Sequence, residues 1–305
     1  MKPPTNPASG ILLVDKPQGV TSHDVVARAR RALGTRKVGH AGTLDPMATG
    51  LLVLGIDSST RLLTYLVGLD KEYFATIRLG QATTTDDAEG EPTGGADAGG
   101  VSRADVDTGV ARLTGDIDQV PSSFSAIKVD GRRSYDRARA GELVELEPRR
   151  VTIRAFEVLA ERRAGEFLDL DVRVECTSGT YIRALARDLG TDLGVGGHLT
   201  ALRRTRVGPF SVDAAVELGA VAPESEALPH AVRSPAAVAA LLYPTVELDD
   251  AQVRDLAHGK RLELAMPDTE VLAALTPAGR LAGLIAVKGG AARVLINFPT
   301  SEVLA

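Results

Sequence analysis

Two stretches of alternating apolar and polar side chains constrain the fold of this chain most. From Tyr73 to Leu79 every second residue is apolar, and the same period recurs from Leu168 to Cys176. A period of two places alternate side chains on opposite faces of a strand, so both stretches are predicted to be half-buried β-strands. The predicted strands and helices do not alternate one for one. We therefore expect an α+β fold around a mostly antiparallel or mixed sheet.

The first hundred residues predict further elements around these strands. The apolar runs 11–14 and 51–54 are typical of buried strands. Ser22 offers an N-cap to a helix whose apolar residues share one face, and a second helix is expected at about 60–67. Residues 91–100 are small, polar and rich in glycine, so we expect a mobile loop there that carries no catalytic residue.

The length of 305 residues favours a large domain followed by a smaller one. The pattern loosens between Val212 and Leu242, which predicts a first domain of residues 1–240 and a second of residues 244–305. In the second we expect a short helix at Asp249–His258 and three β-rich runs after it.

Composition excludes several classes of protein. No apolar run approaches the roughly 18 residues that a membrane span needs, and residues 1–7 lack the apolar block of a signal peptide. We expect a cytoplasmic protein without a membrane partner. Cys176 is the single cysteine, which excludes an intramolecular disulfide and a thiolate zinc cluster.

The net charge of -5 argues at first against a nucleic-acid partner. The charge is unevenly distributed, because residues 210–305 carry 7 basic and 12 acidic side chains and the preceding part is neutral. Basic residues gather in the segments 21–40 and 198–209. Charge counting alone favours solvated faces over nucleic-acid patches for both segments.

One loop holds a carboxylate rigidly. Asp45 lies among Gly39, Gly42 and Gly50, and Pro46 restricts the backbone directly after it. An Asp-Pro pair in a loop is more often a turn than a catalytic site, so spacing alone leaves both interpretations open.

The full string of this loop is more specific. It resembles, residue for residue, a motif of the TruB-type tRNA pseudouridine synthases, and the resemblance extends over about residues 10–210 in five segments. The segments are Lys16-Pro17 with 19–22 (Gly-Val-Thr-Ser), 39–52 (Gly-His-Ala-Gly-Thr-Leu-Asp-Pro-Met-Ala-Thr-Gly-Leu-Leu), 70–73 (Asp-Lys-Glu-Tyr), 178–183 (Ser-Gly-Thr-Tyr-Ile-Arg) and 198–204 (His-Leu-Thr-Ala-Leu-Arg-Arg).

The resemblance implies a pseudouridine synthase fold, with a mixed or antiparallel central sheet flanked by helices and a small C-terminal PUA-like β domain. It implies isomerisation of uridine 55 in the T loop of tRNA, with base flipping and Asp45-dependent rearrangement of the glycosidic bond. Asp45 would attack the sugar or the uracil ring, or stabilise positive charge on the ribose. No cofactor and no metal is implied.

The resemblance also assigns roles to other residues. Arg183 would pair with Asp45 and favour its charged form, although by itself it looks like an exposed residue in the first turn of a helix. Tyr73 would stack on the flipped uracil and act as a base, although a strand tyrosine is more often an aromatic at the edge of a core.

Four further residues are expected to bind substrate. Tyr181 would shape the pocket, and Leu202 would line it. His40 would help to hold the target nucleotide out of its stack, although an isolated histidine is usually a local hydrogen-bonding residue. Lys16 lies near the site or supports its motif structurally, and the sequence favours neither alternative.

The family has an RNA-gripping insertion at about residues 120–150, where this chain carries several arginines. The alternative is an ordinary exposed helix. The tail from about Pro244 resembles a PUA domain more weakly, and its acidic balance departs from an RNA clamp. We expect tRNA as the partner, no required protein partner, and a monomer.

Two other functions compete with this hypothesis. A catalytically silent RNA-binding module would not need Asp45, Tyr73 and Arg183 together. An unrelated hydrolase or phosphotransferase is disfavoured, because the chain has no phosphate-binding loop, no nucleophile elbow and no dinucleotide fingerprint.

Overall fold

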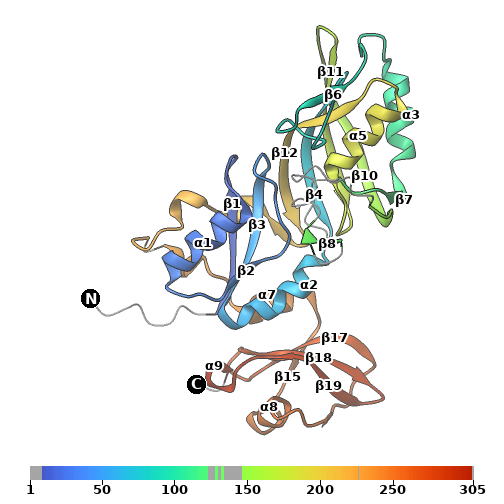
Figure 1. The fold of residues 1–305 in the computed structure, drawn as a ribbon. Helices are drawn as coiled ribbons and strands as arrows, with labels where there is room; N and C mark the ends of the chain where they lie inside the picture. Colours follow the sequence, from blue (N-terminus) through green and yellow to red (C-terminus); the bar gives the residue numbers. More distant parts are fainter. Residues whose placement is uncertain (1–8, 123–127, 130–131, 134–145, 226, 304–305) are drawn as a thin grey trace.

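The computed structural model describes residues 9–122, 128–129, 132–133, 146–225 and 227–303. Within these residues the chain forms one ten-stranded sheet with helices on its faces and, beyond residue 244, a separate five-stranded sheet (Figure 1). The order along the large sheet is β14-β1-β3-β12-β4-β11-β10-β7, with β13 beside β12 and β2 beside β3. Its strands are β1 (Gly10–Lys16), β2 (Val38–His40), β3 (Thr49–Ile56), β4 (Lys71–Leu79), β7 (Gly115–Gln119), β10 (Arg149–Ala164), β11 (Phe167–Cys176), β12 (Gly197–Val207), β13 (Phe210–Ser211) and β14 (Val216–Glu217).

The sheet is mixed, as predicted. Strands β1 and β14 are parallel, as are β3 and β12, whereas the other pairs along the sheet are antiparallel. The alternating stretches form β4 and β11, which pair with each other, and the apolar side chains of β11 from Leu168 to Cys176 are all buried. The predicted α+β class is therefore confirmed.

The apolar run in β3 explains why the sheet is covered on both faces. Leu51 and Val53 belong to one hydrophobic cluster, whereas Leu52 and Leu54 belong to another that includes the apolar face of α1. Alternate residues of one strand thus reach two cores, which requires an almost continuous apolar sequence. A third cluster lies between β4, β11 and the helices α3 and α5. The helices of this part are α1 (Ser22–Leu33), α2 (Leu63–Val67), α3 (Arg103–Arg112), α5 (Ile182–Asp192), α6 (Leu228–Ala231) and α7 (Pro235–Leu242), with 3-10 helices η1 (Asp57–Leu62), η2 (Val212–Ala214) and η3 (Leu218–Ala220).

The start of α1 differs from the prediction by one residue. Thr21, not Ser22, is the N-cap: its hydroxyl accepts from the Asp24 N–H, and the Asp24 side chain accepts from the Thr21 N–H. Ser22 is buried in the first turn, and its hydroxyl bonds to the backbone of Leu44 instead. The helix expected at 60–67 is present as η1 followed by α2.

Residues 91–100 do not form the unpacked loop that their composition predicts. Strand β6 (Pro92–Gly94) pairs with β5 (Ala82–Thr83), and Ala98 is fully buried. The Ala96 N–H donates to the Val195 carbonyl, and the Ala98 N–H donates to the Glu166 carbonyl. Backbone pairing thus orders a segment that has few side chains to pack.

The second sheet has the order β15-β17-β18-β19-β16. It contains the predicted β-rich runs, and the predicted short helix lies between its first two strands in the chain. Its elements are β15 (Thr245–Glu247), α8 (Asp250–Ala257), β16 (Leu262–Glu263), β17 (Thr269–Leu275), β18 (Leu281–Lys288), β19 (Ala291–Asn297) and α9 (Thr300–Val303). Figure 1 shows this sheet against the side of the molecule that carries α2 and α7. Side chains from both sheets share one hydrophobic cluster, so the division at about residue 240 stays a prediction.

In the described part of the chain, none of the helices combines the length and the apolar character that a membrane crossing requires.

Candidate active site

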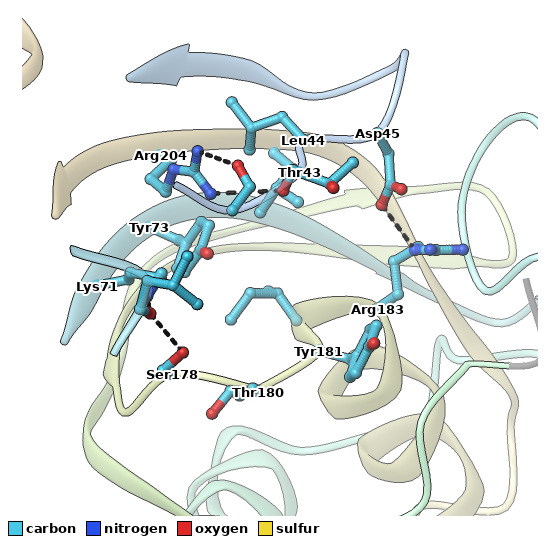
Figure 2. Close-up of a pocket in the computed structure, with 15 residues that line it drawn as sticks. Thr43, Leu44, Asp45, Lys71, Tyr73, Ser178, Thr180, Tyr181, Arg183 and Arg204 are labelled. Atoms are coloured by element: carbon cyan, nitrogen blue, oxygen red, sulfur yellow. Dashed lines mark hydrogen bonds and ion pairs between the residues drawn. The ribbon is translucent and has the colours of Figure 1, made fainter. Parts of the chain in front are cut away.

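A cavity of about 270 Å³ opens where the Asp45 loop, two central strands and the start of α5 meet (Figure 2). Five of the seven predicted site residues line it, and Lys16 and His40 lie outside the lining. The five are Asp45, Tyr73, Tyr181, Arg183 and Leu202. The lining residues are Gly42, Thr43, Leu44, Asp45, Val67, Lys71, Tyr73, Ser178, Gly179, Thr180, Tyr181, Ile182, Arg183, Leu202 and Arg204.

The loop that carries Asp45 is fixed by hydrogen bonds on both sides of the carboxylate. Before it, the Ser22 hydroxyl donates to the Leu44 carbonyl at 3.0 Å and accepts from the Leu44 N–H at 2.9 Å. After it, the Gly19 N–H donates to the Pro46 carbonyl at 2.8 Å, and the Ala48 N–H closes a turn onto the Asp45 carbonyl. Asp45 is therefore presented from an anchored turn that runs directly into β3.

The expected ion pair between Asp45 and Arg183 is present. Arg183 lies in the first turn of α5, and its Nε is 3.0 Å from Oδ2 of Asp45. The guanidinium is almost fully buried, whereas the carboxylate keeps 35% of its side-chain surface exposed toward the pocket. The simpler interpretation of Arg183 as an exposed helix residue is thus wrong.

Arg183 favours the charged form of Asp45, as expected, but the net shift of the Asp45 pKa is upward. Desolvation raises the pKa of the Asp45 carboxyl above its ordinary value of 3.8, and the nearby Asp87 adds to this rise. The Arg183 and Lys16 cations oppose the rise without reversing it. The pair therefore holds an anion that is less stable than a solvated carboxylate, which is a feature of reactive groups in enzymes.

A second carboxylate that the sequence did not indicate shares the Arg183 guanidinium. Asp87 is 2% exposed, and its Oδ2 lies 3.5 Å from Nη1 of Arg183. The same Nη1 donates to the Thr85 carbonyl at 2.8 Å and to the Ser122 hydroxyl at 3.3 Å. These contacts fix the guanidinium plane, so Arg183 is directed toward Asp45. The local sequence gives no sign that Asp87 belongs to a site, since it lies in a short polar segment that is typical of a turn.

Tyr73 lies on β4, on the other side of the pocket from Asp45 and Arg183 (Figure 2). It is 7% exposed and is hydrogen-bonded to Arg204. Burial raises the pKa of the Tyr73 hydroxyl, and this effect outweighs the opposing influence of Arg204. The phenol is thus favoured over the phenolate. The expected roles of Tyr73, stacking on the flipped base and acting as a base, both stay predictions.

Tyr181 and Leu202 lie in the pocket wall as expected. Tyr181 is the residue before α5, and the Gln119 side chain clamps its backbone: Oε1 accepts from the Tyr181 N–H at 2.8 Å, and Nε2 donates to the Tyr181 carbonyl at 3.1 Å. Leu202 comes from β12 and is 7% exposed.

Lys16 supports the backbone next to the site. It is fully buried, and its ammonium donates to the carbonyls of Pro17 at 3.0 Å, Val20 at 2.6 Å and Pro46 at 3.3 Å. Burial lowers the pKa of Lys16 to about 8. Because these three carbonyls match the three N–H donors of an ammonium, the structure favours the structural alternative over substrate binding.

His40 ends β2 and packs edge-to-face against His23, with ring centroids 5.9 Å apart. Its Nδ1 is buried and has no hydrogen-bond partner among the described residues. Burial and the neighbouring His23 lower the pKa of His40, so the neutral ring is favoured. A contact with RNA stays a prediction for this residue.

Most of the predicted RNA-gripping insertion lies outside the described residues. Within 120–150 the structure gives the pairing of β8 (Lys128–Val129) with β9 (Arg132–Arg133). The described residues contain no group of three or more His, Cys, Asp or Glu side chains arranged to hold a metal ion.

Models of known protein families match the chain over almost its whole length. Residues 30–182 match the model of the TruB family pseudouridylate synthase N-terminal domain. Residues 183–245 match the tRNA pseudouridylate synthase B C-terminal domain, and residues 243–299 match the tRNA pseudouridine synthase II C-terminal domain.

Individual relatives agree with these matches. The chain is 58% identical over 301 residues to tRNA pseudouridine synthase B of Leifsonia xyli subsp. xyli, covering 97% of this chain and 98% of the relative. It is 55% identical over 282 residues to the Rhodococcus jostii protein of the same name, covering 92% and 91%. Among solved structures, a Cbf5-Nop10-Gar1 complex contains a chain with 26% identity and a TM-score of 0.72, covering 98% of this chain and 88% of that one. The chain therefore belongs to the TruB family of pseudouridylate synthases.

Proposed function

We propose that this protein isomerises uridine 55 in the T loop of tRNA to pseudouridine, with Asp45 as the catalytic carboxylate. The observation that carries this proposal is the Asp45–Arg183 pair at 3.0 Å in a pocket of a TruB family chain. Relatives that cover nearly all of the chain carry the name tRNA pseudouridine synthase B, which supports tRNA as the substrate.

The reaction rearranges bonds within one nucleotide. The bond from ribose C1′ to uracil N1 breaks, a bond from C1′ to C5 forms, and the proton lost from C5 is balanced by one gained at N1. Atoms and electrons balance without an external oxidant or reductant. An ionised carboxylate can attack C1′ or the uracil ring, or stabilise positive charge on the ribose.

The other pocket residues position the carboxylate and bind the flipped base. Arg183 holds the Asp45 carboxylate in place and offsets part of its desolvation. Tyr73 presents an aromatic ring on which a flipped base can stack, and Leu202 and Tyr181 complete the wall. His40 and the insertion at 120–150 would act on the RNA outside the pocket.

A catalytically silent RNA-binding module is the main competing function. It gives no reason for a raised pKa at Asp45 or for a buried arginine that is shared between two carboxylates. Such an arrangement is costly for folding and is typical of sites that carry out chemistry. We therefore favour the enzyme.

The direct test incubates the purified protein with an unmodified tRNA transcript in EDTA and maps pseudouridine by carbodiimide labelling and primer extension. We expect one product, at position 55. A transcript with cytidine at that position serves as the control and should give none. Tight binding without any product would support the silent module, and a product elsewhere would contradict the assigned position.

A further inference from the structure

Arg204 is a buried arginine that belongs to the motif at 198–204 but has no role assigned from the sequence. It comes from β12, lines the pocket and is 1% exposed. Among the salt bridges of the described residues, none involves Arg204. A buried guanidinium is costly to desolvate unless its donors are satisfied, so its partners indicate what it does.

Besides the Tyr73 hydroxyl, the partners of this guanidinium are carbonyls on both sides of Asp45. Nη2 donates to the Gly42 carbonyl at 3.0 Å, and Nη1 donates to the Thr43 carbonyl at 3.4 Å. Nε donates to the Leu51 carbonyl at 2.8 Å. Figure 2 shows the side chain of Arg204 beside the loop that leads to Asp45. One rigid planar group therefore joins the two ends of the loop.

The backbone of Arg204 contacts the same loop. Gly50 pairs with Arg204 where β3 and β12 run parallel, and Gly50 has φ of +101°. A Cβ on Gly50 would lie 2.2 Å from the Arg204 carbonyl oxygen, so only glycine fits there. Main chain and side chain of one residue thus contact the segment that precedes Asp45 and the segment that follows it.

We propose that Arg204 is a positioning residue that clamps both ends of the Asp45 loop and so fixes the catalytic carboxylate opposite Tyr73. The inference rests on the proposed function for its kinetic consequence, but its structural part is independent of the reaction. Misplacement of a catalytic group lowers the turnover rate more than it lowers the affinity for substrate. Loss of the clamp is therefore expected to lower kcat and to leave KM for tRNA nearly unchanged.

The test compares Arg204→Gln and Arg204→Lys with the control Arg206→Gln. Arg206 lies on the same strand but pairs with the Glu175 carboxylate at 2.8 Å, away from the loop. We expect Arg204→Gln to lower kcat about 100-fold with KM within about threefold, and Arg204→Lys to restore part of the loss. Hydrogen–deuterium exchange of amides from Gly42 to Leu51 should accelerate in Arg204→Gln and stay unchanged in Arg206→Gln.

Wild-type kcat together with wild-type exchange in Arg204→Gln would overturn the proposal. If that variant does not fold, Arg204→Lys decides in the same way, because it keeps the charge but loses the planar fork. A wild-type protein that forms no pseudouridine would contradict the proposed function instead. In that case the exchange rates still decide whether Arg204 clamps the loop.

Discussion

The Nε atom of Arg183 lies 3.0 Å from the Asp45 carboxylate, while Nη1 of the same side chain lies 3.5 Å from the buried carboxylate of Asp87. One cation thus serves two carboxylates in different environments. Asp45 faces the pocket, whereas Asp87 is almost completely enclosed. This relationship links the chemistry of the site to its stability, and the first three predictions follow from it.

Asp45→Asn should abolish pseudouridine formation and leave tRNA affinity within about threefold, since an amide of the same shape lacks the charge that the reaction needs. Because burial raises the pKa of Asp45, its ionised form costs folding free energy at neutral pH. The variant should therefore melt at or above the wild-type temperature. Asp107→Asn, at an exposed position on α3, is the control. Measurable turnover by Asp45→Asn would exclude Asp45 as the catalytic group.

The raised pKa of Asp45 also predicts how activity depends on pH. The reaction needs the carboxylate, so kcat should be constant at high pH and fall as the pH drops through the folded-state pKa, which lies above the ordinary 3.8. Asp87 raises this pKa, so Asp87→Asn should shift the acid limb of the kcat profile to lower pH. Single-turnover rates of the wild type and of Asp87→Asn across the acid range measure the acid limb of each protein. A shift to higher pH would contradict the proposed electrostatic coupling.

Arg183→Met should destabilise the protein by about 3 kcal/mol, because it leaves the buried Asp87 carboxylate without its cation. Arg183→Met combined with Asp87→Asn should recover part of this loss in free energy of unfolding, but no activity. Urea denaturation measures the stabilities. As a control, Arg154→Met removes the exposed pair with Asp70 and should cost less than about 1 kcal/mol. If the double variant is no more stable than Arg183→Met, the Arg183–Asp87 contact does not stabilise the fold.

The local elements could be predicted from the sequence because their signals are local. The period of two in β4 and β11 and the apolar run in β3 fix which residues face a core, and each is visible within ten residues. The Asp45 loop could be recognised because the sequence motif at 39–52 is specific to one family. Its partner Arg183, and the residues Tyr181 and Leu202, followed only from the resemblance.

The contacts that hold the site could not be predicted, since they join residues far apart in the chain. Arg204 bonds the Gly42 carbonyl across 162 positions, and Arg183 bonds the Thr85 carbonyl across 98. Nothing in the local sequence distinguishes these buried arginines from half-buried ones such as Arg203, which pairs with Asp15. The pairing of residues 91–100 was missed for the same reason, because its partners are backbone groups of other segments.

At the start of α1, removal of two adjacent hydroxyls is expected to affect stability and kcat differently. Thr21 caps the helix at an exposed position, so Thr21→Ala should cost about 1 kcal/mol and leave kcat unchanged. Ser22 is buried and exchanges two hydrogen bonds with the backbone of Leu44, the residue before Asp45. Ser22→Ala leaves both Leu44 groups unsatisfied and should cost about 1–3 kcal/mol. It should also lower kcat, because the loop loses an anchor next to its carboxylate. Thermal unfolding and single-turnover kinetics of the two variants separate these effects, and equal kcat values would show that the Leu44 anchor serves stability alone.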